Sequence, residues 1–188
     1  MTTFREYINE MTGSLQQLQR IVAAKNQPVY IVTAGIQGSG KSTFAIQNFE
    51  NIEIVDLDEI NKEMVNGDMT KFSENRSKAI AKKNEVVKSL FNSKKSFIDA
   101  GTAANVQATL RKLKLAKSLG YITAVVYVNI PIDVALERNR ERLARGSHGV
   151  PIENEMAVIN RTDMNVRTTI REINNNKELV DFFIEKRA

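Results

Sequence analysis

The sequence contains no cysteine and a single histidine, His148. The absence of cysteine excludes disulfides, thiolate metal sites and a cysteine nucleophile. One histidine cannot build a histidine-rich metal site or a histidine-paired nucleophile within the chain, and we interpret His148 as an ordinary exposed loop side chain. No internal repeat, low-complexity tract or Gly/Pro/Ser-rich linker is present, so nothing divides the chain into separate units.

Long apolar runs are also missing. The first residues, MTTFREYINEMTGSL, carry charges where a secretory signal would have its apolar core, and no run approaches the length of a membrane span. We therefore expect a cytoplasmic protein. A length of 188 residues, with 42% hydrophobic and 26% charged residues, suits one globular domain. We expect a helical extension at residues 1–27 and a core at residues 29–188.

Positive charge is concentrated in one stretch. The chain has a net charge of +5 and a pI of about 9.4, which favours an anionic partner or simply a basic solvated surface. Residues 71–95 alone carry +6. Their basic members are Lys71, Arg76, Lys78, Lys82, Lys83, Lys88, Lys94 and Lys95. Such a stretch is typical of a nucleic-acid interface, and its alternative is a solvated helix face.

Apolar runs alternate with helical patterns along the chain. Strands are predicted at 29–34, 52–56, 96–100, 121–130 and, more weakly, 179–185. Helices are predicted at 4–25, 41–49, 73–92, 105–119 and 132–145. This alternation predicts an α/β fold with a parallel sheet flanked by helices and ligands at the carboxyl ends of the strands.

The glycine-rich run after the first strand carries the most specific motif. Residues 35–42, GIQGSGKS, satisfy the pattern G-x-x-x-x-G-K-[ST] of a P-loop. Its glycines let backbone N–H groups turn toward phosphates, Lys41 reaches the β- and γ-phosphates, and Ser42 ligates Mg²⁺. The predicted triphosphate-binding residues are Gly35, Gln37, Gly38, Ser39, Gly40, Lys41, Ser42 and Thr43. We expect ATP and Mg²⁺, because the chain lacks the N-K-x-D element of GTPases.

Carboxylates follow the second and third predicted strands. Asp58 is a candidate base for an attacking hydroxyl, and Asp56 is either its companion or a helix N-cap beside a solvated acid. Asp99 ends the third strand, where an aspartate can orient Mg²⁺ together with Ser42, or else cap a loop. The sequence therefore predicts catalytic Asp58 and a metal site at Ser42 and Asp99.

An arginine-rich segment at residues 137–151, ERNRERLARGSHGVP, comes later in the chain. Spacing of i, i+4 and i+7 puts Arg138, Arg142 and Arg145 on one helix face, while Arg140 points elsewhere and could pair with Glu137 or Glu141. Arginines on a lid over the phosphates neutralise charge in phosphoryl transfer. We expect Arg142 and Arg145 to be catalytic and Arg138 to bind the nucleotide, with a salt-bridged solvated helix as the alternative.

The order P-loop, VDLDEI, FIDAGT and RNRERLARG…VP resembles the polynucleotide kinase and zeta toxin group of P-loop kinases, over roughly residues 29–162. The resemblance implies that Asp58 is the base, that Asp99 is the acidic residue after the third strand, and that Arg145 contacts nucleotide phosphates. The group carries an arginine three residues after the base, where this chain has Asn61.

Three functions are consistent with these residues. The first is a kinase, like those of phages, that phosphorylates a hydroxyl of a nucleic acid, either a 5′ end or a hydroxymethylated base, with DNA favoured and the stretch Lys71 to Lys95 as its interface. The second is a zeta-toxin-like kinase of a sugar nucleotide. The third is an ATP-binding switch or motor without an acceptor, against which Asp58 argues.

Overall fold

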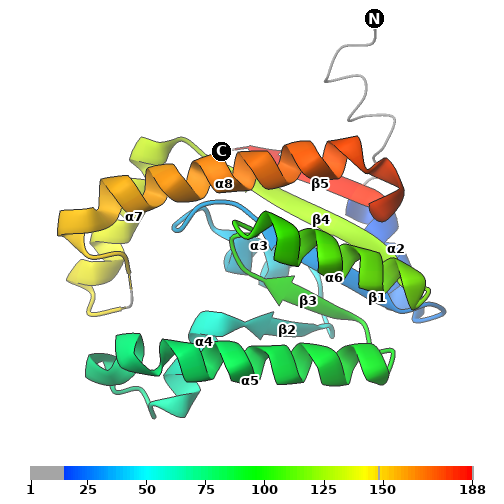
Figure 1. The fold of residues 1–188 in the computed structure, drawn as a ribbon, viewed down its shortest axis with the longest axis horizontal. Coiled ribbons are helices and arrows are strands. Elements are labelled where there is room, and N and C mark those ends of the chain that lie inside the picture. Colours follow the sequence, from blue (N-terminus) through cyan, green and yellow to red (C-terminus); the bar gives the residue numbers. More distant parts are fainter. Residues whose placement is uncertain (1–14, 148, 188) are drawn as a thin grey trace, which may run out of the picture.

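Five parallel strands form the centre of the molecule, described by a computed structural model over residues 15–147 and 149–187. They are β1 (Val29–Ala34), β2 (Glu53–Asp56), β3 (Phe97–Ala100), β4 (Ile122–Asn129) and β5 (Phe182–Arg187). Their spatial order is β2-β3-β1-β4-β5, so each is joined to the next by a crossover that includes a helix (Figure 1). The predicted α/β class and the parallel sheet are confirmed.

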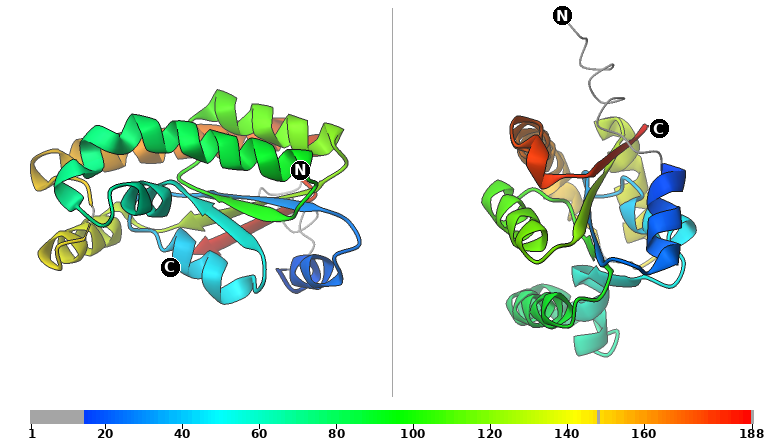
Figure 2. Two further views of the ribbon diagram at one scale, coloured as in Figure 1. Left: turned by 90° about the horizontal axis from the view of Figure 1, so that it is seen from below. Right: turned by 90° about the vertical axis from the view of Figure 1, so that its right-hand side faces the viewer.

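Helices cover both faces of this sheet (Figure 2). One layer contains α5 (Phe72–Asn92), α6 (Val106–Ser118) and α8 (Glu155–Asn175). The other contains α2 (Leu15–Ala24), α3 (Lys41–Asn48) and α7 (Ile132–Ala144). A short helix, α4 (Leu57–Met64), continues directly from β2. Within the described ranges, no helix combines the length and apolarity needed to cross a membrane.

The apolar sequence pattern explains this layering. All six residues of β1 are buried, as expected for a central strand covered on both faces. Phe91 of α5 packs against Tyr30 and Phe97 of the sheet in tilted and edge-on contacts, with ring centroids about 5 Å apart. On the other face, Leu18 and Val22 of α2 are buried in the core. The earlier part of the predicted N-terminal helix and His148 lie outside the described residues.

The last strand begins later than the sequence suggests. Residues Lys177–Leu179 form a single 3-10 turn, and the Asp181 backbone N–H then donates to Thr123 O. The Asp181 carboxylate in turn accepts from the Thr123 N–H. With Asp181 bonded in this way, β5 begins at Phe182 and ends at Arg187, which places Lys186 and Arg187 at the carboxyl edge of the sheet.

Candidate active site

The loop between β1 and α3 forms a tight cradle of backbone. Gly35 has φ 142°, and a Cβ there would lie 2.5 Å from Val128 O. A Cβ on Gly38, at φ 79°, would lie 2.9 Å from Ala135 O. Gly40 is left-handed and is the N-cap of α3. Gly35 and Gly38 exclude side chains, because only glycine combines positive φ with such close backbone approach.

The ammonium group of Lys41 folds back over this loop. Its Nζ donates to Ile36 O at 2.6 Å and to Ser39 Oγ at 3.0 Å. Burial and the nearby positive charge of Arg142 lower the pKa of Lys41 to about 8, although Asp56 and Asp58 act in the opposite direction. Charged residues from the end of β2, from α4 and from α7 thus all act on the P-loop lysine.

The end of β2 supplies a carboxylate to the first turn of α3. Asp56 is the N-cap of α4, and its Oδ1 accepts from the Asp58 N–H at 2.8 Å. Its other oxygen, Oδ2, accepts from the Ser42 hydroxyl at 3.0 Å. The N-cap interpretation of Asp56 is therefore correct, and the same carboxylate also touches the P-loop serine.

Asp58 lies in the first turn of α4, two residues after its N-cap, and remains accessible. Its side chain is 39% exposed, and its Oδ1 lies 3.5 Å from Arg76 Nη1 of α5. Asn61 is fully buried instead: its amide donates to Phe72 O and accepts from Asn75 Nδ2. Asn61 thus links α4 to α5. The arginine beside Asp58, Arg76, belongs to α5, and no local sequence pattern predicts that the two pair.

The structure places Asp99 away from Ser42. Asp99 Oδ1 is 2.7 Å from Lys83 Nζ, its Oδ2 is 2.6 Å from Lys112 Nζ, and the Tyr30 hydroxyl also donates to it. Burial acts to raise the pKa of this carboxyl, but the two ammonium groups outweigh it and hold the pKa below the usual value. Both oxygens are committed, so this geometry favours a structural ion cluster over the predicted metal ligand.

Strand register explains that difference. Asp99 lies opposite Val55 of β2, whereas Asp56 lies opposite Ala100 of β3. Residues opposite one another on neighbouring strands share a face, and successive residues alternate. Asp56 and Asp99 consequently point to opposite faces of the sheet. The carboxylate on the P-loop side belongs to β2.

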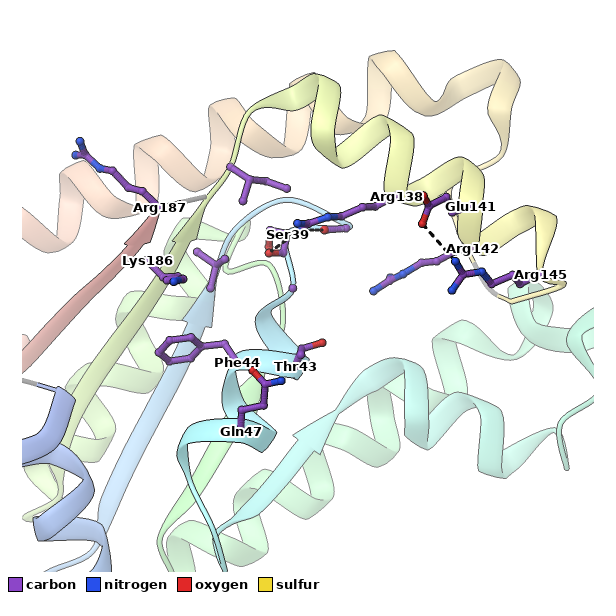
Figure 3. Close-up of a pocket in the computed structure, with 14 residues that line it drawn as sticks. Ser39, Thr43, Phe44, Gln47, Arg138, Glu141, Arg142, Arg145, Lys186 and Arg187 are labelled. Carbon is purple, nitrogen blue, oxygen red and sulfur yellow. Dashed lines mark hydrogen bonds and ion pairs between the residues drawn. The ribbon is translucent and has the colours of Figure 1, made fainter.

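Two arginines of α7, Arg138 and Arg142, and its C-cap Arg145 line one pocket with the P-loop, as their spacing predicts. Arg138 Nη1 donates to Gly38 O at 3.2 Å, and Arg142 extends into the space between α7 and α3 (Figure 3). Arg145 is 78% exposed and lies 3.5 Å from Glu141. Arg138 and Arg142 therefore contact or face the phosphate cradle directly, whereas Arg145 stands at its rim.

A cluster of hydrogen bonds centred on Asn139 and Glu155 holds the segment after α7 in place. Asn139 donates to Val150 O and to Glu155 and accepts from the Val150 N–H. Arg140 does not pair with Glu137 or Glu141 as the sequence suggested; its Nε donates to Glu155 Oε1 at 2.7 Å. This hydrogen bond lowers the pKa of Glu155. These hydrogen bonds help to fix the position of α7, and with it the position of the arginines over the P-loop.

The pocket has a volume of about 400 Å³ and extends beyond the P-loop. Besides the glycine loop and α7, its walls include residues that sequence reasoning did not single out. These are Phe44, Gln47, Val128, Ile130, Lys186 and Arg187. No short motif marks them, because they come from α3 and from the ends of β4 and β5, far apart in the sequence.

The residues present fit a nucleoside triphosphate with Mg²⁺. The P-loop closes around α3's N-terminus, where backbone N–H groups and the helix dipole favour phosphate. Gln37 Oε1 is buried and has no hydrogen-bond partner within the described part of the chain. Because amide oxygen and nitrogen are interchangeable by a flip, this side chain can donate to a phosphate oxygen. Ser42 and Asp56 supply the oxygen ligands that Mg²⁺ prefers.

Solved structures of similar fold include a candidate kinase and a chain of a toxin–antitoxin system. A candidate kinase from Chloroflexus aurantiacus J-10-fl is 19% identical, with a TM-score of 0.55 over 70% of this chain and 76% of that one. A chain of the PezAT toxin–antitoxin system of Streptococcus pneumoniae is 18% identical, with a TM-score of 0.58 over 92% and 74%. These likenesses show a P-loop kinase-like fold.

A third structure was determined with ATP. It is the AvrRxo1-ORF1:-ORF2 complex, at 13% identity and a TM-score of 0.64, covering 92% of this chain but only 57% of the other. No curated protein matches the sequence. A sequence profile of the family described as AAA domain (AAA_33) matches residues 30–169, from β1 into α8. The chain therefore belongs to the AAA_33 family of AAA domains.

Proposed function

We propose that this protein is an ATP-dependent kinase that transfers the γ-phosphate to a hydroxyl of a nucleic acid. The observation that carries the proposal is the position of Asp58, an accessible carboxylate in the first turn of α4, two residues after Asp56, which pairs with Ser42 of the P-loop. An accessible carboxylate in this place can take the proton of an acceptor hydroxyl. In this proposal residues 29–188 form the kinase core and residues 1–27 an N-terminal helical extension.

The donor half is built by the P-loop and α7. Lys41 and Arg142 are both cationic groups near the loop, and together they offset the negative charge that the transferred group carries. Mg²⁺, held through Ser42 and Asp56, would supply further charge neutralisation on the phosphate oxygens. Arg138 is already held against the loop through Gly38 O, and Arg145 at the rim reaches the same pocket.

The acceptor half centres on Asp58. Its carboxylate takes the proton of the acceptor hydroxyl as that oxygen forms a bond to the γ-phosphorus. The bond from the γ-phosphorus to the β–γ bridging oxygen breaks, and ADP leaves with its electron pair. Arg76, 3.5 Å from Asp58, places a positive charge beside the carboxylate that accepts the proton.

Helix α5 makes a nucleic acid the favoured acceptor. It begins near α4 and runs along one edge of the sheet (Figure 1). Lys78 and Lys88 are exposed on it without an ion-pair partner among the described residues, whereas Lys82 pairs with Glu85 and Lys83 turns inward to Asp99. A strand of nucleic acid along this helix would meet free positive charge leading toward Asp58. A 5′-hydroxyl end or a hydroxymethylated base of DNA suits this geometry.

A sugar nucleotide is the alternative acceptor. Asn61 is buried between α4 and α5, so the position three residues after Asp58 offers no arginine to a terminal phosphate. The shared fold with a PezAT chain is consistent with either acceptor. A small acceptor would fill the space beside Asp58 without using the exposed lysines of α5.

Labelled ATP separates these acceptors. The protein is incubated with [γ-³²P]ATP and Mg²⁺ and, in separate reactions, a 5′-hydroxyl oligonucleotide, hydroxymethyl-base DNA or a sugar nucleotide. We expect label on one of the nucleic acids. Label on the sugar nucleotide alone would replace the nucleic-acid proposal with the alternative, and ATP turnover without a labelled acceptor would indicate a switch or motor.

A further inference from the structure

The pocket beside the P-loop extends beyond the space that a triphosphate needs. It runs along α3 past Phe44 and Gln47 and ends at the last residues of β5 (Figure 3). Phe44, Val128 and Ile130 give this end apolar walls, while Gln47 and Lys186 add polar groups. Apolar walls with a few placed polar groups are characteristic of small-molecule sites, and 400 Å³ is within their usual size range.

The two basic residues at the end of β5 differ in their availability. Arg187 donates from Nε and Nη2 to the two oxygens of Glu185, each at 3.0 Å. Glu185 is itself held by Asn129. Lys186, by contrast, has no ion pair or hydrogen bond within the described residues, and it is exposed. Arg187 is therefore occupied and Lys186 is available to a ligand.

Strand alternation puts Lys186 on the face of the sheet that α3 covers. Successive residues of a strand point to opposite faces, so Lys186 shares a face with Phe182 and Ile184. Those two side chains pack in the core layer that also contains α3. Figure 3 shows Lys186 near the ring of Phe44, while Arg187 points away from the other labelled side chains. The free ammonium thus belongs to the α3 side, where the pocket is.

We infer that the end of β5 completes the nucleobase subsite of the donor nucleotide, with Lys186 donating to an acceptor atom of a purine base. This inference rests on the proposed nucleotide-binding function of the P-loop. With the triphosphate at the N-terminus of α3, the nucleoside extends along α3 toward Phe44 and Lys186. Both purines present N7 as an acceptor, whereas pyrimidines do not. Gln47 carries both an acceptor and donors, so it can meet either adenine N6 or guanine O6.

The test compares ATP with inorganic tripolyphosphate, which has the phosphates but no nucleoside. Binding of each to the full chain with Mg²⁺ is measured by calorimetry in wild type, Lys186→Met and Lys186→Arg. Lys114→Met is the matched control, because Lys114 is an exposed lysine of α6 on the opposite face of the sheet. No acceptor is needed, so the result does not depend on which hydroxyl the enzyme phosphorylates.

We expect Lys186→Met to weaken ATP binding about tenfold or more, the loss of one charge-assisted hydrogen bond, and to leave tripolyphosphate binding unchanged. Lys186→Arg should retain most of the ATP affinity. Equal weakening of both ligands, or of neither, would overturn the assignment. Wild type that binds ATP no more tightly than tripolyphosphate would overturn the subsite alone, whereas wild type that binds neither ligand would overturn the nucleotide site itself.

Discussion

Asp56 and Asp99 stand at the ends of neighbouring strands, yet their surroundings differ completely. Asp56 accepts from the Ser42 hydroxyl and caps α4. Asp99 is 7% exposed and lies between Lys83 and Lys112. A shift of one residue in register turns one carboxylate toward the P-loop and the other into the core beneath α5 and α6. Two aspartates at neighbouring strand ends can therefore differ in role according to the face of the sheet on which each lies.

The strongest effect on stability is expected from Asp99. Asp99→Asn leaves two partly buried ammonium groups without their counter-ion and should lower the free energy of unfolding by about 3–5 kcal/mol, measured by urea denaturation. The control is Asp68→Asn, which breaks a surface pair with Lys71 and should cost much less. Equal losses in both variants would show that the cluster is not structural.

The pH dependence of the same variant has a defined sign. The folded-state pKa of Asp99 lies below its usual 3.8, so its contribution is complete above that pH. It is lost as the pH falls through the folded pKa. The stability difference between wild type and Asp99→Asn should accordingly persist at neutral pH and shrink only in strong acid. A difference that disappears between pH 5 and 7 would contradict the ion cluster.

Asp56 should affect metal use and leave stability nearly unchanged. Asparagine caps a helix as well as aspartate, so Asp56→Asn keeps the N-cap while removing the charge beside Ser42. We expect the Mg²⁺ concentration for half-maximal activity to rise about tenfold or more. Asp99→Asn, assayed below its melting temperature, should leave this concentration unchanged. The reverse pattern would restore Asp99 as the metal ligand.

Nucleotide affinity should depend on pH through Lys41. Since the pKa of Lys41 is about 8 in the free protein, the ammonium loses its proton as the pH rises past this value. Phosphate binding requires the charged form, so ATP affinity should fall by up to about tenfold per pH unit above pH 8. Lys41→Met should bind ATP weakly with no such slope, and an unchanged slope in this variant would assign the titration to another group.

The smallest effect is expected from the exposed lysines of α5. Lys78→Ala and Lys88→Ala should each weaken DNA binding across sequences and reduce the salt slope of log K by about 1. Lys114→Ala on α6 provides the control. A slope unaffected by either α5 variant would remove this helix from the interface.

Sequence patterns were sufficient for the features that depend on local chemistry. The P-loop of residues 35–42 and the strands around it follow from glycine spacing and apolar runs, and the i, i+4, i+7 spacing correctly grouped the α7 arginines. The sequence did not predict which face of the sheet Asp99 occupies, because a one-residue shift in strand register reverses that face without changing the apolar pattern of the strand. Arg76 beside Asp58 and Lys186 in the pocket depend on packing between distant segments, which no local motif encodes.

The most direct test compares phosphoryl transfer in Asp58→Asn and Asp99→Asn. Transfer from [γ-³²P]ATP to the best acceptor is measured per folded molecule, since only the second variant is expected to unfold easily. We predict that Asp58→Asn lowers the rate by roughly 10²–10⁴-fold, the usual contribution of a general base, while Asp99→Asn stays near wild type. Full transfer by Asp58→Asn, or loss of transfer by folded Asp99→Asn, would contradict this account.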